Sequence, residues 1–251
     1  MLKQELNVVV IGASSGIGKE VSHIFAQKGH NVICGSRDEK ELKWLAEDLK
    51  IRYGNTAYGV PVDLMNKESV QYFIEKIYHS FTEIDCLVVT AGILPDVQIE
   101  FHDADNLMNT TLTNYVGIAM VLNEVSRRMM QNKTGTIICL SSVAGERGRQ
   151  SNFIYGASKS ALNTYLQGLR MKMYSHNVRI VTVLPGYVDT PMSYGKVDPK
   201  LAVSPQYVAK KIYRLIYSKR NIVYIPIVWW LVMAIIKLIP EAIFKRLASD
   251  F

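Results

Sequence analysis

The sequence predicts a doubly wound α/β fold, with a parallel sheet of seven strands covered by helices on both faces. Short apolar runs alternate along the 251 residues with longer segments of helical period. Several runs, including Val8–Ile11 and Leu87–Val89, are apolar throughout, which is typical of strands buried on both faces. Repeated strand–helix units of this length require right-handed crossovers and therefore a parallel sheet. Such sheets bind ligands at the carboxyl ends of their strands.

The predicted strands are short apolar runs bounded by turn residues, namely Asn7–Ala13, Asn31–Ser36, Ala57–Val62, Cys86–Ala91, Thr136–Ser141, Arg179–Leu184 and Ile222–Ile225. Helical periodicity predicts helices near Gly16–Lys28, Asp38–Arg52, Lys67–Phe81, Asp103–Gln131, Asn152–Tyr174 and Pro205–Tyr217. No linker precedes residue 222. We therefore expect one catalytic domain over residues 1–225 and a hydrophobic, helical C-terminal tail over residues 226–251.

Charge and residue usage narrow the functional class. The net charge is +7, and residues 210–251 hold eight basic and two acidic side chains, so nearly all of the excess lies at one end. A local excess of this kind indicates a local surface partner and argues against general nucleic-acid binding. The five histidines are scattered without ligand spacing, and no metal site is expected.

The cysteines and the N-terminal segment indicate an intracellular protein. Cys34, Cys86 and Cys139 each fall inside a predicted strand, and their odd number without metal-ligand spacing predicts core residues in a reducing compartment. The N-terminal residues lack the basic, apolar and small-residue pattern of a signal peptide, which favours a cytoplasmic location.

A glycine-rich turn follows the first strand directly, with the sequence Gly12-Ala13-Ser14-Ser15-Gly16-Ile17-Gly18. Gly12 permits a tight turn, Gly16 lets the backbone approach a pyrophosphate, and Gly18 allows the next helix to pack close to the sheet. The helix N-terminus offers N–H donors and a positive dipole end. The position of this glycine-rich turn directly after the first strand favours a dinucleotide site over a turn without a ligand.

The end of the second strand distinguishes between the two nicotinamide cofactors. Enzymes that select NAD place an acidic side chain there, on the ribose 2′-hydroxyl. This strand ends at Ser36, and Arg37 follows with a guanidinium that suits a 2′-phosphate. Asp38 and Glu39 are expected to begin the next helix instead. NADP(H) is therefore the predicted cofactor, and the alternative is that Arg37 is only a solvated surface charge.

A tyrosine and a lysine four residues apart form the predicted catalytic pair. On a helix, Tyr155 and Lys159 share one face, and a nearby ammonium lowers the pKa of a phenol, which prepares it for proton transfer. This spacing alone is common on helix surfaces. A strand ends at Ser141-Ser142, thirteen residues before Tyr155, and this separation resembles the one at which short-chain dehydrogenases/reductases place their catalytic serine.

Together, these motifs over residues 6–225 resemble the short-chain dehydrogenase/reductase family. The resemblance implies a Rossmann fold, hydride transfer from NADPH to a carbonyl, substrate orientation by Ser142, proton donation by Tyr155, and a Lys159 that tunes Tyr155 and holds the ribose. It assigns Asn114 a fourth catalytic role, in which it shapes the middle helix and holds a water beside Lys159. It further implies cofactor contacts by Asp63, Ala91, Gly92, Pro185, Gly186, Val188 and Thr190. Ile11 and Thr90 depart from the family pattern, which has Thr and Asn there.

The tail leaves two interpretations open. Asn221–Ile236 carries no charge but is short for a bilayer-spanning helix. Trp229, Trp230 and the basic residues after them favour an interfacial helix at the cytoplasmic membrane face. The alternative is a subunit contact in a homodimer or homotetramer. Family members with similar tails suggest a keto-lipid substrate or a keto-sugar of envelope polysaccharide synthesis. A soluble 3-oxoacyl or carbonyl reductase and a non-catalytic NADPH-binding scaffold remain as alternatives.

Overall fold

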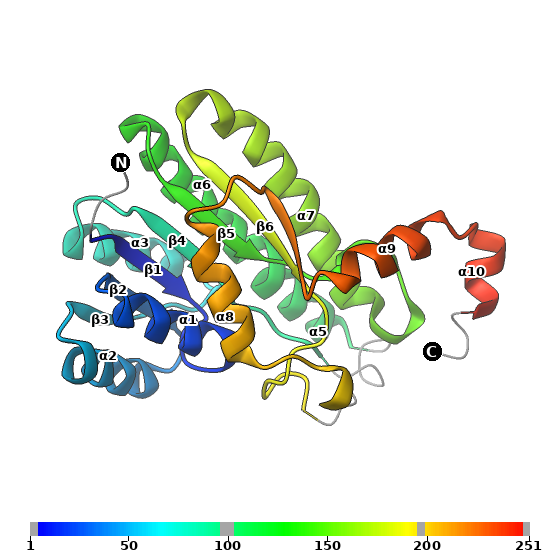
Figure 1. The fold of residues 1–251 in the computed structure, drawn as a ribbon, viewed down its shortest axis with the longest axis horizontal. Coiled ribbons are helices and arrows are strands. Elements are labelled where there is room, and N and C mark those ends of the chain that lie inside the picture. The colour runs from blue at the N-terminus through cyan, green and yellow to red at the C-terminus, as the bar shows by residue number, and fades with distance from the viewer. Residues whose placement is uncertain (1–4, 96–102, 195–198, 248–251) are drawn as a thin grey trace.

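The computed structural model describes residues 5–95, 103–194 and 199–247. Seven parallel strands form one sheet in the order β3-β2-β1-β4-β5-β6-β7 (Figure 1), which confirms the predicted fold class. The strands are β1 (Asn7–Ile11), β2 (Asn31–Ser36), β3 (Ala57–Pro61), β4 (Cys86–Val89), β5 (Thr136–Leu140), β6 (Arg179–Pro185) and β7 (Ile222–Ile225). The chain builds outward from β1 to β3 and then returns to β4 on the other side of β1. This reversal creates a crevice at the carboxyl ends of β1 and β4.

Helices cover both faces of the sheet because the strand residues alternate between two cores. Val8 and Val10 point to a core shared with α1 (Gly16–Gln27), α2 (Glu39–Tyr53) and α8 (Pro205–Leu215). Val9 and Ile11 point to a core shared with α3 (Lys67–Ser80), α6 (Gly117–Asn132) and α7 (Phe153–Met173). In Figure 1, α1 and α8 lie in front of the sheet and α6 and α7 lie behind it. Both faces are therefore buried, as the apolar strands predict.

The cysteines lie inside these cores. Cys34, Cys86 and Cys139 are buried and not bonded to one another, and burial raises the pKa of each thiol to about 12. A thiol that stays protonated is a poor nucleophile and a poor metal ligand. Their role is packing, in agreement with the prediction.

The long helix predicted over Asp103–Gln131 is divided into three parts. α5 (Ala104–Thr111) is followed by a π-helical turn, Leu112–Val116, and then by α6. A π-turn holds one extra residue per turn and often marks a functional site, and here it carries Asn114. The buried residues of this turn are polar, Thr113 and Asn114. The helical segment predicted over Asp103–Gln131 is therefore confirmed, and the π-helical turn inside it was not predicted.

The C-terminal tail contains α9 (Val228–Leu238) and α10 (Glu241–Leu247), which project beyond the sheet (Figure 1). α9 has 11 residues, or about 16 Å at the usual rise per residue. No helix among the described residues is long and apolar enough to span a bilayer. α9 nevertheless contacts the body of the protein, because Met233 is fully buried against Val143 and Leu184. Residues 248–251 of the predicted tail lie outside the described residues.

Candidate active site

A cavity of about 700 Å³ lies where the strands end. Seventeen of the residues predicted for the site line it, namely Gly12, Ser14, Ser15, Gly16, Ile17, Gly18, Arg37, Asp63, Ala91, Gly92, Ser142, Tyr155, Lys159, Pro185, Gly186, Val188 and Thr190. Asn114 is fully buried and is not among the lining residues. We call the side formed by Gly12–Gly18 the phosphate-turn end and the side formed around Ser142 the Ser142 end.

The phosphate-turn end depends on close backbone approach. Gly12 and Gly16 have φ of +88° and +50°, a left-handed conformation that favours glycine. A Cβ on Gly18 would lie 2.0 Å from the Gly12 carbonyl oxygen, so only glycine lets α1 begin against the turn. Ser15 caps α1 in an extended conformation, and its hydroxyl makes no capping hydrogen bond. The first N–H groups of α1 and this hydroxyl are therefore available to an anion.

Thr90 supports the turn from the neighbouring strand. Its hydroxyl donates hydrogen bonds to the carbonyl oxygens of Ile11 at 2.9 Å and Gly12 at 3.2 Å. The short threonine therefore joins the end of β4 to the turn through its own side chain. The sequence signalled only a departure from the family pattern here, and its structural role was not predicted.

The end of β2 offers polar groups that fit a phosphate. The Ser36 hydroxyl is buried and makes no hydrogen bond within the described residues. Arg37 is exposed, lines the same cavity, and has no acidic partner in that part of the chain. Asp38 caps α2 by accepting a hydrogen bond from the Glu41 N–H at 3.0 Å. The prediction that Asp38 and Glu39 begin the helix is confirmed, and the strand end carries a cation and an unpaired hydroxyl.

Tyr155, Lys159 and Ser142 meet at the opposite end of the cavity. The Lys159 Nζ lies 5.7 Å from the centre of the Tyr155 ring, one helical turn along α7. The Ser142 hydroxyl lies close enough to the Tyr155 phenol to lower its pKa, and it accepts a hydrogen bond from the Ala144 N–H at 3.1 Å. Lys159 is almost completely buried. These side chains are therefore close enough to act on one substrate oxygen.

The electrostatics differ from the expected lowering of the tyrosine pKa by lysine. Burial raises the pKa of Tyr155 above its usual value, and the Ser142 hydroxyl offsets only part of this effect. Burial also lowers the pKa of Lys159 to about 8. The apolar surroundings disfavour both charged forms. The spacing of Tyr155 and Lys159 predicted that they lie together, but not that both are shielded from water. The expectation that Lys159 lowers the pKa of Tyr155 below its usual value was therefore wrong.

Asn114 connects the π-turn to the cavity wall. Its Oδ1 accepts a hydrogen bond from the Ile93 N–H at 2.8 Å, and its Nδ2 donates to the Ile93 carbonyl at 2.9 Å. Nδ2 also lies 3.2 Å from the Ser158 hydroxyl. A Cβ on Gly92 would lie 3.1 Å from the Lys159 Nζ and 3.2 Å from the Asn114 Oδ1. Asn114 thus fixes the segment that borders Lys159, while its water-holding role stays a prediction.

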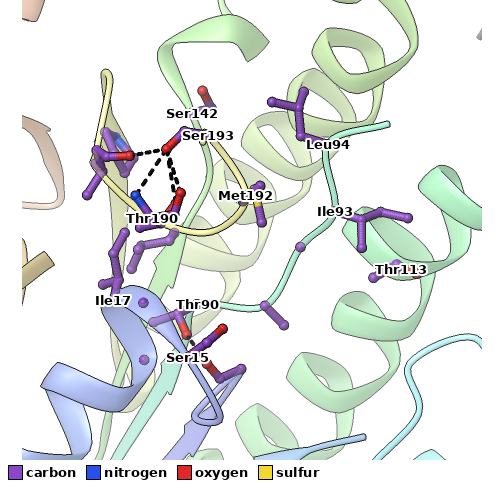
Figure 2. Close-up of a pocket in the computed structure, with 18 of the residues that line it drawn as sticks. Ser15, Ile17, Thr90, Ile93, Leu94, Thr113, Ser142, Thr190, Met192 and Ser193 are labelled. Carbon is purple, nitrogen blue, oxygen red and sulfur yellow. Dashed lines mark hydrogen bonds between the residues drawn. The ribbon is translucent and has the colours of Figure 1, made fainter. Parts of the chain in front are cut away.

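A loop after β6 covers the cavity from one side. Ser193, which the sequence analysis missed, accepts a hydrogen bond from the Thr190 N–H at 3.1 Å and donates to the Val188 and Thr190 carbonyls. Thr190 reaches the phosphate turn, because its Cγ2 lies 3.2 Å from where a Gly16 Cβ would be. Figure 2 shows Met192 of this loop and the segment of Ile93 and Leu94 on two sides of the cavity. Apolar side chains therefore face each other across the cavity.

The tail contributes a further lining residue, Trp229, which sequence reasoning assigned to a membrane or subunit surface. A Cβ on Gly186 would lie 1.8 Å from its Nε1, so the indole lies directly on that glycine. Its ring also meets Tyr187 edge-on, with centroids 5.3 Å apart. The spacing of Trp229 and Met233 on one helical face could have indicated an inward face for α9.

Comparisons with known proteins agree with this geometry. A family model described as short chain dehydrogenase matches residues 6–200. An oxidoreductase from Staphylococcus saprophyticus is 32% identical over 204 residues, covering 78% of this chain and 87% of the relative. A 3-oxoacyl-(acyl-carrier-protein) reductase from Aquifex aeolicus is 30% identical over 188 residues, covering 74% and 75%. A short chain dehydrogenase from Burkholderia cenocepacia, solved in complex with NADP, has a TM-score of 0.82 at 23% identity, covering 98% of this chain and 99% of that chain.

Proposed function

Since the chain belongs to the short chain dehydrogenase family of oxidoreductases, we propose that it reduces a carbonyl group with NADPH and uses Tyr155 as the general acid. The convergence of Ser142, Tyr155 and Lys159 on one cavity, with a phosphate-binding turn at its other end, carries this proposal. A cavity of about 700 Å³ has the size of known cofactor sites.

Arg37 and Ser36 favour NADPH over NADH. An exposed guanidinium without an acidic partner in the described chain, beside a buried hydroxyl without a partner, suits a 2′-phosphate. The phosphate turn and the free hydroxyl of Ser15 would hold the pyrophosphate. When bound, the cofactor supplies the hydride. Solved structures of the same fold include a Sphingobium yanoikuyae dehydrogenase in complex with NADPH.

The raised pKa of Tyr155 suits reduction rather than oxidation. A phenol whose pKa lies above its usual value remains protonated near neutral pH, so it has a proton to donate to the oxygen that gains charge. Ser142 would donate a second hydrogen bond to that oxygen. Lys159, with a pKa of about 8, carries a positive charge at neutral pH, which stabilises the phenolate that forms when the proton leaves.

Replacement of Tyr155 by Phe tests this assignment. We expect Tyr155→Phe to lower kcat for ketone reduction by about two to four orders of magnitude, while the Kd for NADPH stays unchanged. NADPH oxidation at 340 nm with a panel of aliphatic and aromatic ketones gives the rate, and NADPH fluorescence gives the Kd. Tyr53→Phe on α2 is the matched control. A Tyr155→Phe variant as active as the wild type would refute the proposal, and NADPH binding without any turnover by the wild type would favour a scaffold.

The tail offers an apolar surface next to the cavity, so we propose an amphiphilic keto substrate, such as a keto-lipid or lipid-linked keto-sugar, taken up at the inner membrane face. Ile227, Trp230, Leu231 and Leu238 are each more than half exposed. Lys245 and Arg246 in α10 add positive charge. Exposed apolar and basic side chains on one short helical pair favour contact with an anionic lipid surface. On this basis, residues 226–251 are a membrane-contacting extension of a catalytic domain over residues 1–225.

Vesicle flotation distinguishes membrane contact from the alternative, a soluble reductase whose tail joins subunits into a dimer or tetramer. The intact chain and its Trp230→Ala variant are mixed with phosphatidylglycerol vesicles, with Trp44→Ala as the control because Trp44 is exposed on the distant α2. We expect Trp230→Ala to float less than the other two proteins. Equal flotation would refute the membrane proposal, and a change in the light-scattering mass of Trp230→Ala would favour the subunit contact.

A further inference from the structure

α9 presents different residues to the protein and to solvent. Trp229, Met233 and Ile236 fall on one helical face and pack inward, with Met233 fully buried. Trp230 and Leu231 point outward and are more than half exposed. Because side chains three and four residues apart share a face of a helix, the inward face is continuous from the cavity to the end of α9. The inward face therefore has a role that is separate from any contact with lipid.

Trp229 stands at the Ser142 end of the cavity. β5 pairs with β6, and the Ser141 N–H donates a hydrogen bond to the Val183 carbonyl at 2.8 Å. Ser142 and Gly186 directly follow these paired strands, so the indole on Gly186 borders the space in front of Ser142. The phosphate turn follows β1, which is separated from β6 by two strands. Trp229 thus borders the Ser142 end of the cavity and lies away from the phosphate-turn end.

Polar contacts join the tail that carries Trp229 to the loop after Ser142. Glu146, in the loop after Ser142, accepts hydrogen bonds from the Tyr224 hydroxyl at 2.9 Å and the Lys237 Nζ at 2.6 Å. Arg147 donates to the Ile239 carbonyl at 3.2 Å and pairs with Glu241 at 2.8 Å. These bonds join α9 and α10 to the same loop that carries the candidate catalytic serine. A wall anchored at both ends keeps its shape when a ligand enters.

We propose that Trp229 is the residue that determines the size of the carbonyl substituent that the enzyme accepts. The inference rests on the proposed reductase function. Ile93, Leu94 and Met192 add apolar side chains to the cavity wall (Figure 2), and Arg149 and Asn152 add polar ones. An indole held on Gly186 in the cavity wall limits the width of a group that can lie beside it. The substrate class is therefore a carbonyl compound with a narrow substituent beside the reacting carbon.

Kinetics with two ketones of different width test this assignment. Acetophenone carries a methyl group where benzophenone carries a second ring. We expect the ratio of kcat/KM for benzophenone to that for acetophenone to rise by roughly tenfold or more in Trp229→Ala, since a missing side chain admits a larger group. Trp229→Phe is expected to fall between Trp229→Ala and the wild type. Trp44→Ala on the distant α2 should keep the wild-type ratio, and NADPH fluorescence titration should give an unchanged Kd for every variant.

The outcomes separate this inference from the proposed function. An active Trp229→Ala with the wild-type ratio would overturn the inference alone. A weaker Kd for NADPH in Trp229→Ala and Trp229→Phe, with the ratio unchanged, would show that the indole supports the cofactor and would also overturn it. A wild type that reduces no ketone of the wider panel would overturn the proposed function, and the inference with it. Thermal unfolding of each variant identifies a misfolded protein, in which case Trp229→Phe decides the result.

Discussion

The two ends of the cavity are constructed from different parts of the chain. The phosphate-turn end is formed mainly by backbone within one short stretch, Gly12–Gly18, supported by Thr90. The Ser142 end is formed by side chains from β5, α7, the loop after β6 and α9. Backbone geometry at the first end is fixed locally, whereas the second end needs the correct packing of segments far apart in sequence. The first end should therefore tolerate few substitutions, and the second should adapt to different substrates.

The largest expected effect is at the phosphate turn. Gly18→Val places side-chain atoms where the Gly12 carbonyl lies, since even a Cβ would be 2.0 Å from that oxygen. We expect NADPH binding to be lost and the free energy of unfolding to fall by about 1–3 kcal/mol, the range for overpacked sites. Fluorescence titration and thermal unfolding measure both effects. Gly168→Ala is the control, because a Cβ there meets nothing within 4 Å. Normal NADPH binding by Gly18→Val would contradict a backbone-determined turn.

At the phosphate-turn end, we expect the Arg37 side chain to select NADPH over NADH. A hydrogen bond to a charged group contributes about 1.5–3 kcal/mol, so Arg37→Ala is expected to raise the Kd for NADPH by roughly tenfold to one hundredfold. The Kd for NADH should not change. Arg52→Ala is the matched control, because Arg52 is exposed on α2 and pairs only locally with Asp48. Parallel loss of NADH affinity would mean that Arg37 acts on the fold rather than on the 2′-phosphate.

The two ends should also respond differently to pH. Burial lowers the pKa of Lys159 to about 8, so its ammonium is lost as the pH rises through that value. We expect kcat/KM for ketone reduction to fall on the alkaline side of about pH 8. NADPH binding at the backbone turn should change much less. Lys159→Arg keeps a positive charge over this range and should remove the alkaline fall in any activity that it retains. If kcat/KM of Lys159→Arg fell over the same pH range, the group that titrates would be one other than Lys159.

The smallest effect on ligand binding is expected where the tail meets the Ser142 end, although the cost in stability there is larger than at Gly18. Met233→Ala removes a fully buried side chain, a change that costs about 2–5 kcal/mol in well-packed cores. Loosening of α9 should raise KM for the ketone severalfold and increase cleavage of the tail by trypsin, with no change in the Kd for NADPH. Ile235→Ala, on the exposed side of the same helix, is the control. If Met233→Ala raised the Kd for NADPH as much as the KM for the ketone, the phosphate-turn end and the Ser142 end would not be independent.

The same contrast explains how much the sequence could predict. Strand boundaries and the phosphate turn depend on local periodicity and on glycines whose conformation is fixed within a few residues, and these predictions agree with the structure to within one or two residues. β2 and β7 match their predicted bounds, Asn31–Ser36 and Ile222–Ile225. The predicted cofactor and catalytic positions were also brought to one cavity, apart from the buried Asn114.

The remaining features required knowledge of packing. The π-turn at Leu112–Val116 lies inside one helical segment and buries two polar side chains, Thr113 and Asn114, so hydrophobic periodicity does not distinguish it from an ordinary helix. The pKa of Tyr155 depends on how completely its neighbours exclude water, which no spacing of residues specifies. Trp229 appeared as one of two adjacent tryptophans in an apolar run, and only the docked helix separates the inward indole from the outward one.

Glu146 gives the tail a direct influence on the loop that follows Ser142. One carboxylate oxygen receives both the Tyr224 hydroxyl and the Lys237 ammonium, so the loop, β7 and α9 share a single junction. Heating or proteolysis that frees the last two helices would release this loop while the sheet is still intact. Inactivation should then precede global denaturation, and the midpoint temperature for loss of turnover should lie below that for loss of helical circular dichroism.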